Sequence, residues 1–254
     1  MRLDVRLTEK KLCKSRTAAQ SLIKEGSVAV NGAVCRKASY DVAEGDDVSI
    51  VGDQLRYVGR GGLKLEKALT EFGIVLDGAL CVDIGASTGG FTDCMLQNGA
   101  ALVFAVDVGT NQLDEKLRRD DRVVSLEQTD IRSFEFSQHA ERLPENFEGA
   151  DFVGTDVSFI SLKAILPHIH RLLRNGAVAA ALIKPQFEAA TALCAGKSAI
   201  GKNGIVRDEK TRRKIVVEIR DFAQQCGFTV GGIVESPIKG GSGNTEYLMY
   251  LRKG

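Results

Sequence analysis

Beyond residue 62, short apolar runs alternate with helix-like segments, and this alternation constrains the fold more than any other feature of the sequence. The apolar runs lie at 79–84, 101–107, 122–126, 150–156, 177–184, 228–234 and 247–251. Such alternation is typical of a mostly parallel sheet with helices on both faces. The last two runs follow one another without a helix between them, so we expect an α/β fold with a seven-stranded sheet in which one strand is antiparallel.

The first fifty residues follow a different pattern, which predicts a small α+β unit. Ser15 is a candidate N-cap for a helix that ends at Gly26. The pair Asn31-Gly32 between two β-prone runs predicts a hairpin, and the run 46–51 predicts a further strand. The Gly- and Arg-rich stretch that follows is the expected linker. The predicted organisation is an N-terminal domain at 1–52, a linker at 53–62 and an α/β domain at 63–254.

Basic side chains gather near the N-terminus. Residues 1–37 contain nine basic and three acidic side chains, a net charge of +6, whereas the whole chain carries +1. A basic head on a mildly acidic body suggests a polyanion as the partner of the head; an ordinary solvated surface is the alternative. The stretches RLDVRL, SRTAAQSLIKEGSVAVNG and EGDDVSI resemble the S4-type RNA-binding domain, which implies RNA contact through the basic helix face. The residues expected to bind RNA are Arg2, Arg6, Lys10, Lys11, Lys14, Arg16, Lys24 and Arg60.

A glycine-rich turn at 85–90 separates the strand-like run LCVDI from the helix-like run FTDCMLQN. In an open parallel sheet, ligands bind at the carboxyl ends of the strands, where this turn lies. Its spacing, G-x-x-x-G-G, does not match the G-x-G-x-x-G of nicotinamide-binding folds. A P-loop does not fit either, because the stretch GKS at 196–198 has Thr191 where the first glycine is required.

Acidic residues at three successive strand ends favour S-adenosyl-L-methionine as the ligand of this turn. They are Asp83, Asp107 and Asp130. The ligand has no phosphate, and its charged amino-acid end, ribose and adenine call for carboxylates and backbone hydrogen bonds. We therefore predict a Rossmann-like class I methyltransferase. Resemblance to that superfamily implies that Asp83 and Gly85 line the methionine end. It also implies that Asp107 binds the ribose hydroxyls and that Asp130 faces the adenine amino group. The expected cofactor-binding residues are Asp83, Gly85, Ser87, Gly89, Gly90, Phe91, Asp107 and Asp130.

Two further strands end in charged residues, Asp156 and Lys184. A lysine that closes an apolar strand either serves the chemistry at the mouth of the sheet or extends into solvent. The stretches GRGGLKLEKAL, TDVSFISL, LIKPQFE, GKNGIVRD and GNTEYLMYL resemble the TlyA family, whose members are described as haemolysins and as ribosomal RNA 2′-O-methyltransferases. The resemblance spans residues 60–251 and joins an S4-type head to an FtsJ-like body. It implies a catalytic tetrad of Lys64, Asp156, Lys184 and Glu246.

This resemblance implies methylation of cytidine 2′-hydroxyls in ribosomal RNA, with ribosomal RNA or ribosomal subunits as the partner. A ribose hydroxyl is a poor nucleophile until its proton is drawn away, and positioning alone lowers such a barrier by several kcal/mol. The hypothesis is that Lys184 takes the proton while the other three residues orient it. A lysine can do so only if its pKa falls from about 10.4 toward the working pH. A second lysine lowers that pKa and two carboxylates raise it, so the sequence leaves the balance open.

Other methylation chemistries lack their signatures here. A cytosine-C5 enzyme usually has its nucleophilic cysteine beside a proline, which Cys81, Cys94 and Cys194 do not have. A base N-methyltransferase typically has an Asn/Asp-Pro-Pro-aromatic turn after the fourth strand, where this chain reads TDVSFI. Two other classes of function remain alternatives, a non-catalytic RNA-binding protein and a membrane-active haemolysin.

The haemolysin alternative requires export and a segment that inserts into membranes. The first fourteen residues are charged throughout, and the longest apolar run, 177–183, is far short of the roughly 20 residues of a membrane span. The six cysteines show no metal-ligand spacing, and the two histidines of HIH at 168–170 do not face one another on a helix. We therefore expect a cytoplasmic protein with reduced thiols, no metal and no membrane partner. The Gly-rich stretch 188–208, with Lys197 and Lys202, is either an RNA clamp or an ordinary flexible loop.

Overall fold

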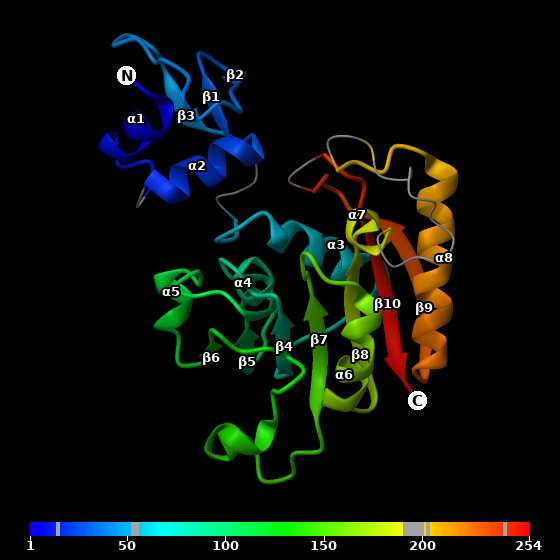
Figure 1. The fold of residues 1–254 in the computed structure, drawn as a ribbon. Coiled ribbons are helices and arrows are strands. Elements are labelled where there is room, and N and C mark those ends of the chain that lie inside the picture. Colours follow the sequence, from blue (N-terminus) through cyan, green and yellow to red (C-terminus); the bar gives the residue numbers. More distant parts are fainter. Residues whose placement is uncertain (14–15, 52–55, 190–200, 202–203, 241–242) are drawn as a thin grey trace. The chain divides into compact units, whose positions relative to one another are not determined.

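The computed structural model describes residues 1–254 except 14–15, 52–55, 190–200, 202–203 and 241–242 (Figure 1). The chain divides into two compact units, Met1–Arg56 and Tyr57–Gly254. This division falls inside the stretch 53–62 that the sequence predicts as a linker, and the first helix of the second unit already begins at Gly61. The expected limits of the two domains stay a prediction.

The N-terminal unit packs two helices against a small antiparallel sheet. The helices are α1 (Leu3–Glu9) and α2 (Arg16–Glu25), and the sheet has the order β2-β1-β3, with β1 at Val28–Val30, β2 at Ala33–Val34 and β3 at Val48–Ile50. Leu3 and Leu7 of α1 and Ile23 of α2 are fully buried in its core. The hairpin is confirmed: Asn31 and Gly32 have φ of 52° and 78°, the left-handed values that a two-residue turn between twisted strands requires. Helix α1 was not predicted from the sequence.

The C-terminal unit is built on a seven-stranded sheet with the order β6-β5-β4-β7-β8-β10-β9. Its strands are β4 (Leu80–Ile84), β5 (Leu102–Val106), β6 (Val123–Leu126), β7 (Ala150–Thr155), β8 (Leu173–Ile183), β9 (Phe228–Glu235) and β10 (Tyr247–Lys253). Strand β10 runs antiparallel to both of its neighbours, whereas the pairs among β4 to β8 are parallel. This confirms the predicted sheet with one antiparallel strand.

Helices cover both faces of this sheet (Figure 1). One apolar cluster joins α3 (Gly61–Phe72) and α4 (Gly90–Gln97) to the sheet and includes Cys81 of β4; the other joins α6 (Leu166–Leu172) and α8 (Glu209–Gln225) to it and includes Val82. Successive residues of β4 thus enter different clusters, as the two-residue period of a strand requires. The short elements are α5 (Glu115–Arg118), η2 (Phe136–Arg142), η3 (Leu162–Ala164) and α7 (Pro185–Glu188).

The topology determines where a ligand can bind. Strand β4 pairs with β5 on one side and β7 on the other, so the direction of strand succession reverses at β4. In open α/β sheets the crevice at the carboxyl ends of the strands beside such a reversal is the usual ligand site. The glycine turn after β4, Asp107 after β5 and Asp156 after β7 all lie at this edge. Among the described residues, no helix is both long enough and apolar enough to cross a membrane.

Candidate functional site

Four charged side chains that lie far apart in the sequence meet at this edge. Lys64 of α3 places Nζ 3.1 Å from Oδ2 of Asp156 and 2.8 Å from Oε2 of Glu246. Lys184, directly after β8, places Nζ 2.5 Å from the other oxygen of Asp156. Lys64, Lys184 and Glu246 are buried. The structure therefore brings all four residues of the expected tetrad together, with Asp156 between the two lysines.

Lys64 and Asp156 hold one another in the ionised state. Burial alone would lower the pKa of Lys64, but the charges of Asp156 and Glu246 outweigh it, so that pKa is raised. Burial alone would likewise raise the pKa of Asp156, but the charges of Lys64 and Lys184 outweigh it and lower that pKa. Lys64 is thus a fixed cation between two carboxylates.

Lys184 has a different set of neighbours. Besides its ion pair with Asp156, its Nζ donates a hydrogen bond to Oγ of Ser158 at 2.9 Å. The same ammonium lies 5.7 Å from the centre of the Phe187 ring. On the far side of the cluster, Gln186 donates to Oε1 of Glu246 at 3.1 Å. The sequence interpretation missed Ser158 and Gln186, although each lies two residues from a predicted tetrad member.

An exposed aromatic side chain lies beside this cluster. Phe159 is 90% exposed, and its ring centre is 4.9 Å from that of Phe187. Its φ of 64° is in the left-handed region, which is uncommon for a bulky residue and costs energy. Such strain is found mainly at functional sites, so Phe159 belongs to the candidate site although its sequence position gave no signal.

The glycine turn between β4 and α4 depends on two residues without a side chain. Gly85 has a φ of +83°, and a Cβ there would lie 3.0 Å from the carbonyl oxygen of Asp156. Gly89 has a φ of +95°, and a Cβ there would lie 2.2 Å from Cδ1 of Leu117. The turn thus lies directly against the strand end that carries Asp156.

Two of the predicted cofactor residues, Asp83 and Phe91, are buried next to this turn. Asp83 is fully buried, and its Oδ2 accepts hydrogen bonds from the backbone N–H of Thr92 at 2.9 Å and from its hydroxyl at 2.6 Å. Burial raises the pKa of Asp83 to about 7. Phe91 is also buried, in the cluster under α3 and α4. Gly90 has almost no space for a side chain, since a Cβ would lie 2.9 Å from the backbone nitrogen of Gly62.

The other predicted cofactor residues include Ser87 on the turn, Asp107 after β5 and Asp130 after β6. Asp107 accepts hydrogen bonds from the backbone N–H of exposed Ser87 at 2.8 Å and of Gly109 at 2.6 Å, so it joins the turn to the loop after β5. Asp130 lies in the loop after β6, and the hydrogen bond from Arg132 lowers its pKa to about 2. The sequence interpretation missed Val108, which is 73% exposed directly after Asp107. Glycines, acidic strand ends and an exposed apolar side chain together fit the amino-acid, ribose and adenine parts of S-adenosylmethionine.

Comparison with known proteins identifies the family. The model of the FtsJ-like methyltransferases matches residues 57–253, and the model of the S4 domain matches residues 1–48. Hemolysin A of Brachyspira hyodysenteriae is 41% identical over 99% of this chain and 99% of its own. The 16S/23S rRNA (cytidine-2′-O)-methyltransferase TlyA of Mycobacterium tuberculosis is 40% identical over 99% of this chain and 89% of its own. The chain belongs to the TlyA family.

Solved structures agree with this TlyA-family fold. A protein of Streptococcus thermophilus described as a candidate hemolysin is 45% identical, with a TM-score of 0.76 over 100% of this chain and 88% of its own. An S-adenosylmethionine-dependent methyltransferase of Mesorhizobium loti has a TM-score of 0.52 over 77% of this chain and 100% of its own, and at 14% identity it supports the fold alone. The FtsJ-like family match supports S-adenosylmethionine as the methyl donor, as predicted.

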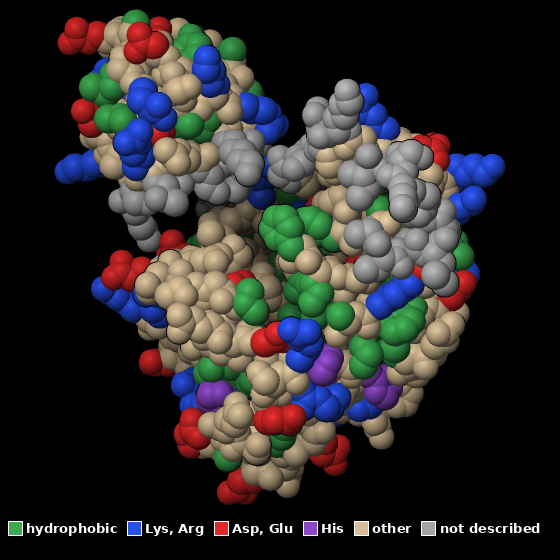
Figure 2. Space-filling model, in the orientation of Figure 1, with side chains coloured by type: hydrophobic (Ala, Val, Ile, Leu, Met, Phe, Trp, Pro, Cys, Tyr) green, Lys and Arg blue, Asp and Glu red, His purple; other side chains and the backbone are tan. Residues whose placement is uncertain are grey.

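The residues expected to bind RNA divide between the two units of the TlyA-family chain. Arg2 and Arg16 both donate to the buried carboxylate of Asp4, while Lys10 and Lys11 are exposed. Arg6, 22% exposed, donates to the backbone oxygen of Glu44. Arg60 belongs to the C-terminal unit, where it donates to the backbone oxygen of Lys239. Several Lys and Arg side chains lie close together on the face of the N-terminal unit that Figure 2 shows. Lys14, the side chain of Lys24 and the expected clamp lysines Lys197 and Lys202 lie outside the described residues.

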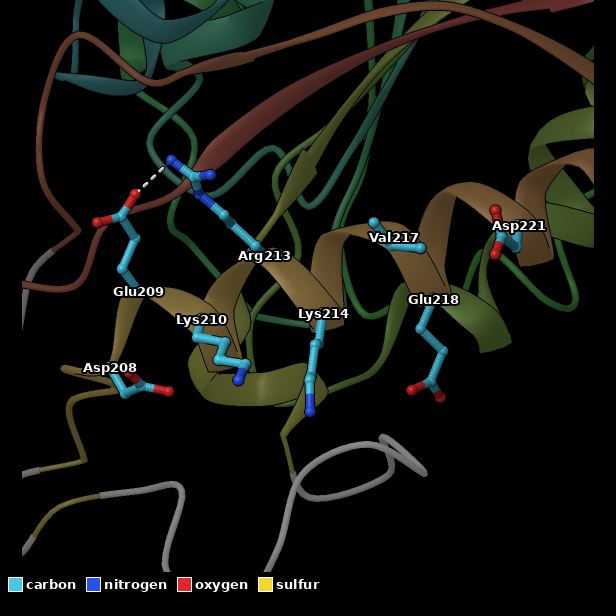
Figure 3. Close-up of a pocket in the computed structure, with 8 residues that line it drawn as sticks. All are labelled: Asp208, Glu209, Lys210, Arg213, Lys214, Val217, Glu218 and Asp221. Atoms are coloured by element: carbon cyan, nitrogen blue, oxygen red, sulfur yellow. Dashed lines mark ion pairs between the residues drawn. The ribbon is translucent and has the colours of Figure 1, made fainter.

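A pocket along the outer face of α8 shares no residue with this site (Figure 3). Its described lining mixes acids and bases, and Arg213 and Glu209 form an ion pair there. The lining residues are Asp208, Glu209, Lys210, Arg213, Lys214, Val217, Glu218 and Asp221. With both signs of charge interspersed, this surface has the character of a solvated helix face.

Proposed function

We propose that this chain transfers a methyl group from S-adenosyl-L-methionine to the 2′-hydroxyl of a cytidine in ribosomal RNA. The observation that carries the proposal is the position of Asp156 between Lys64 and Lys184, at the strand end against which the glycine turn lies. The S4 and FtsJ-like matches and the activity for which the M. tuberculosis relative is named support the same substrate. Because ribosomal RNA is the substrate, we also place the chain in the cytoplasm.

Lys184 acts as the general base in this proposal. Lys64 lies between two carboxylates, and both stabilise its positive charge. Lys184 shares Asp156 with Lys64, and its other polar contact is the neutral hydroxyl of Ser158. Lys64 is thus held by two carboxylates, whereas Lys184 contacts one carboxylate and a neutral hydroxyl, and we assign the role of proton acceptor to Lys184. Lys64 then holds Asp156 in place, and Glu246 holds Lys64.

The proton and the methyl group move in opposite directions at the ribose oxygen. The 2′-hydroxyl gives its proton to Nζ of neutral Lys184, and the oxygen forms a bond to the transferred carbon. Bound S-adenosylmethionine supplies that methyl group on a positively charged sulfur, which keeps the electron pair of the broken bond and becomes a neutral thioether. Asp156 stabilises the ammonium formed on Lys184. Because Asp156 and Ser158 hold the amine in one direction, the residues contribute mainly by orientation.

Phe159 provides a surface for the target base. A base must leave its stack before its ribose can enter a crevice of this kind, and aromatic side chains stabilise unstacked bases in RNA-binding proteins. Phe159 lies three residues after Asp156, is exposed, and packs against Phe187, whose ring is also near Lys184. A base stacked on Phe159 thus keeps its ribose near the proposed general base.

Mass mapping of ribosomal RNA from cells with and without the gene tests the substrate directly, since one ribose methyl group on a cytidine should disappear. In vitro, Lys184→Ala should abolish methyl transfer and leave S-adenosylmethionine affinity, measured by calorimetry, within about twofold of wild type. Lys67→Ala is the matched control, because Lys67 lies on α3 near Lys64 but pairs with Glu71 at the surface. A wild-type chain that binds RNA but transfers no methyl group would contradict the proposal and favour a non-catalytic RNA-binding protein.

A further inference from the structure

A buried carboxylate in the N-terminal unit holds two arginines. Asp4 of α1 is 0% exposed, whereas the side chains of Arg2 and Arg16 are 47% and 55% exposed. Arg2 donates from Nε at 2.9 Å and from Nη2 at 3.0 Å, one bond to each oxygen of Asp4. Arg16 donates from Nε at 3.0 Å, and Gln20 donates at 2.7 Å, both to Oδ2. Asp4 was not among the residues singled out from the sequence.

Arg2 and Arg16 have more hydrogen-bond donors than the carboxylate of Asp4 can accept. Asp4 accepts four hydrogen bonds from Arg2, Arg16 and Gln20, one at Oδ1 and three at Oδ2, about as many as a carboxylate has lone-pair sites. Hydrogen bonding from Arg2 has the largest effect on the pKa of Asp4. Together with the hydrogen bonds from Gln20 and Arg16, it outweighs the effect of burial and lowers that pKa, so the carboxylate stays ionised. Each guanidinium has five N–H bonds, and Asp4 takes two from Arg2 and one from Arg16. The rest of each half-exposed guanidinium must find acceptors elsewhere.

An anion with several acceptor oxygens suits this arrangement. A guanidinium fixed at its Nε edge keeps a planar pair of donors in a set direction, which is the geometry of bidentate phosphate recognition. Fixing both arginines before the ligand arrives removes the side-chain entropy that binding would otherwise cost. The unit is an S4 domain with a net basic N-terminal segment, so the available polyanion is the RNA of the proposed reaction.

We propose that Asp4 is a positioning residue for RNA binding, which holds Arg2 and Arg16 as a rigid pair of cations for backbone phosphates. The proposal rests on RNA being the substrate. This proposal and an argument from net charge alone predict opposite effects of removing Asp4 on RNA affinity. Asp4 is negative, so its removal makes the unit more basic and, by charge alone, would strengthen the attraction to RNA. If Asp4 positions the arginines, its removal weakens binding instead.

The test compares Asp4→Asn with Glu44→Gln in the full chain. Both variants remove one negative charge from the N-terminal unit, and the side chain of Glu44 is exposed. Affinity is measured by fluorescence anisotropy over a range of salt concentrations, with a labelled RNA transcript that the wild-type chain methylates. We expect Asp4→Asn to weaken binding about tenfold at 0.15 M salt and to reduce the salt slope by about 0.7 to 1.8, the value for one or two lost phosphate contacts. Glu44→Gln should bind as tightly as wild type or more tightly.

A second variant covers the case in which Asp4→Asn destabilises the N-terminal unit, which thermal unfolding would reveal. Replacing Arg2 and Arg16 together by lysine keeps every charge and the ion pairs to Asp4 but loses the planar donors, and we expect about tenfold weaker binding. Equal or tighter RNA binding by folded Asp4→Asn, or wild-type affinity of the double lysine variant, would overturn the proposal. If wild type transfers methyl groups normally, either of these results overturns only the role of Asp4 and leaves the proposed function intact. A wild-type chain that methylates no RNA contradicts the proposed function instead.

Discussion

Ser158 is exposed at the surface, yet its hydroxyl oxygen lies 2.9 Å from Nζ of buried Lys184 and accepts an aligned hydrogen bond from it. This contact is a second hold on the amine, beside its ion pair with Asp156. The hydroxyl is neutral, so it contributes to the position of Lys184 through one hydrogen bond and adds no charge to the cluster.

Ser158→Ala should therefore lower the rate of methyl transfer. Without the acceptor, Lys184 loses part of its orientation, and we expect kcat to fall about tenfold while the KM for S-adenosylmethionine is unchanged. Ser158→Thr restores the hydroxyl and should recover most of the rate. If Ser158→Thr is as slow as Ser158→Ala, the hydroxyl does not orient Lys184 and the prediction is wrong.

Asp83 predicts a pH dependence of stability in the C-terminal unit. Its pKa is raised to about 7 in the folded chain, compared with about 4 for an unfolded aspartate. Between these values the folded chain keeps a proton that the unfolded chain has lost, so the free energy of unfolding should fall as pH rises from 4 to 8, by about 2 to 4 kcal/mol. Asp83→Asn removes this titration and should flatten the curve. Urea unfolding of both chains across this range, without cofactor, measures the difference, and parallel curves would contradict the prediction.

The sequence predicts the sheet and the charged residues at its strand ends for one physical reason. A buried parallel strand must be a short apolar run, so the residue that follows it, such as Asp107 or Asp156, is recognisable by position alone. Lys64 and Glu246 lie outside that pattern, and family resemblance placed them. Ser158 and Asp4 are important because of residues that lie near them only in the folded chain, so their positions in the sequence give no comparable signal. Asp83 was predicted from its position to bind the cofactor; the structure shows it buried with Thr92 as its donor, and its contact with the cofactor stays a prediction.

Gly89 and Gly78 separate the effect of a steric clash from that of backbone strain. Both have positive φ, +95° and +70°, but a Cβ at Gly78 would meet nothing within 4 Å, whereas one at Gly89 would lie 2.2 Å from Leu117. Gly78→Ala should lower the free energy of unfolding by about 1 kcal/mol, the cost of the left-handed conformation. Gly89→Ala should cost about 3 kcal/mol, because it also displaces Leu117.

Gly89→Ala should also weaken S-adenosylmethionine binding, because the turn would have to move, while Gly78→Ala should leave it unchanged. Urea unfolding and calorimetry on the two variants provide the comparison. Equal losses of stability in both would show that the contact with Leu117 relaxes at no cost.

Phe159→Ala should affect RNA methylation without affecting the fold. The side chain is 90% exposed and its backbone is in the left-handed region, so truncation should leave the melting temperature within about 2 °C of wild type. Stacking of one base on an aromatic ring contributes about 1 to 3 kcal/mol, so kcat/KM for RNA should fall about 10- to 100-fold. The affinity for S-adenosylmethionine should be unchanged. Val75→Ala, at another exposed apolar residue of the same unit, is the matched control. Phe159→Trp keeps an aromatic face and should retain most of the activity; if it is as inactive as Phe159→Ala, the side chain does not serve as a stacking surface.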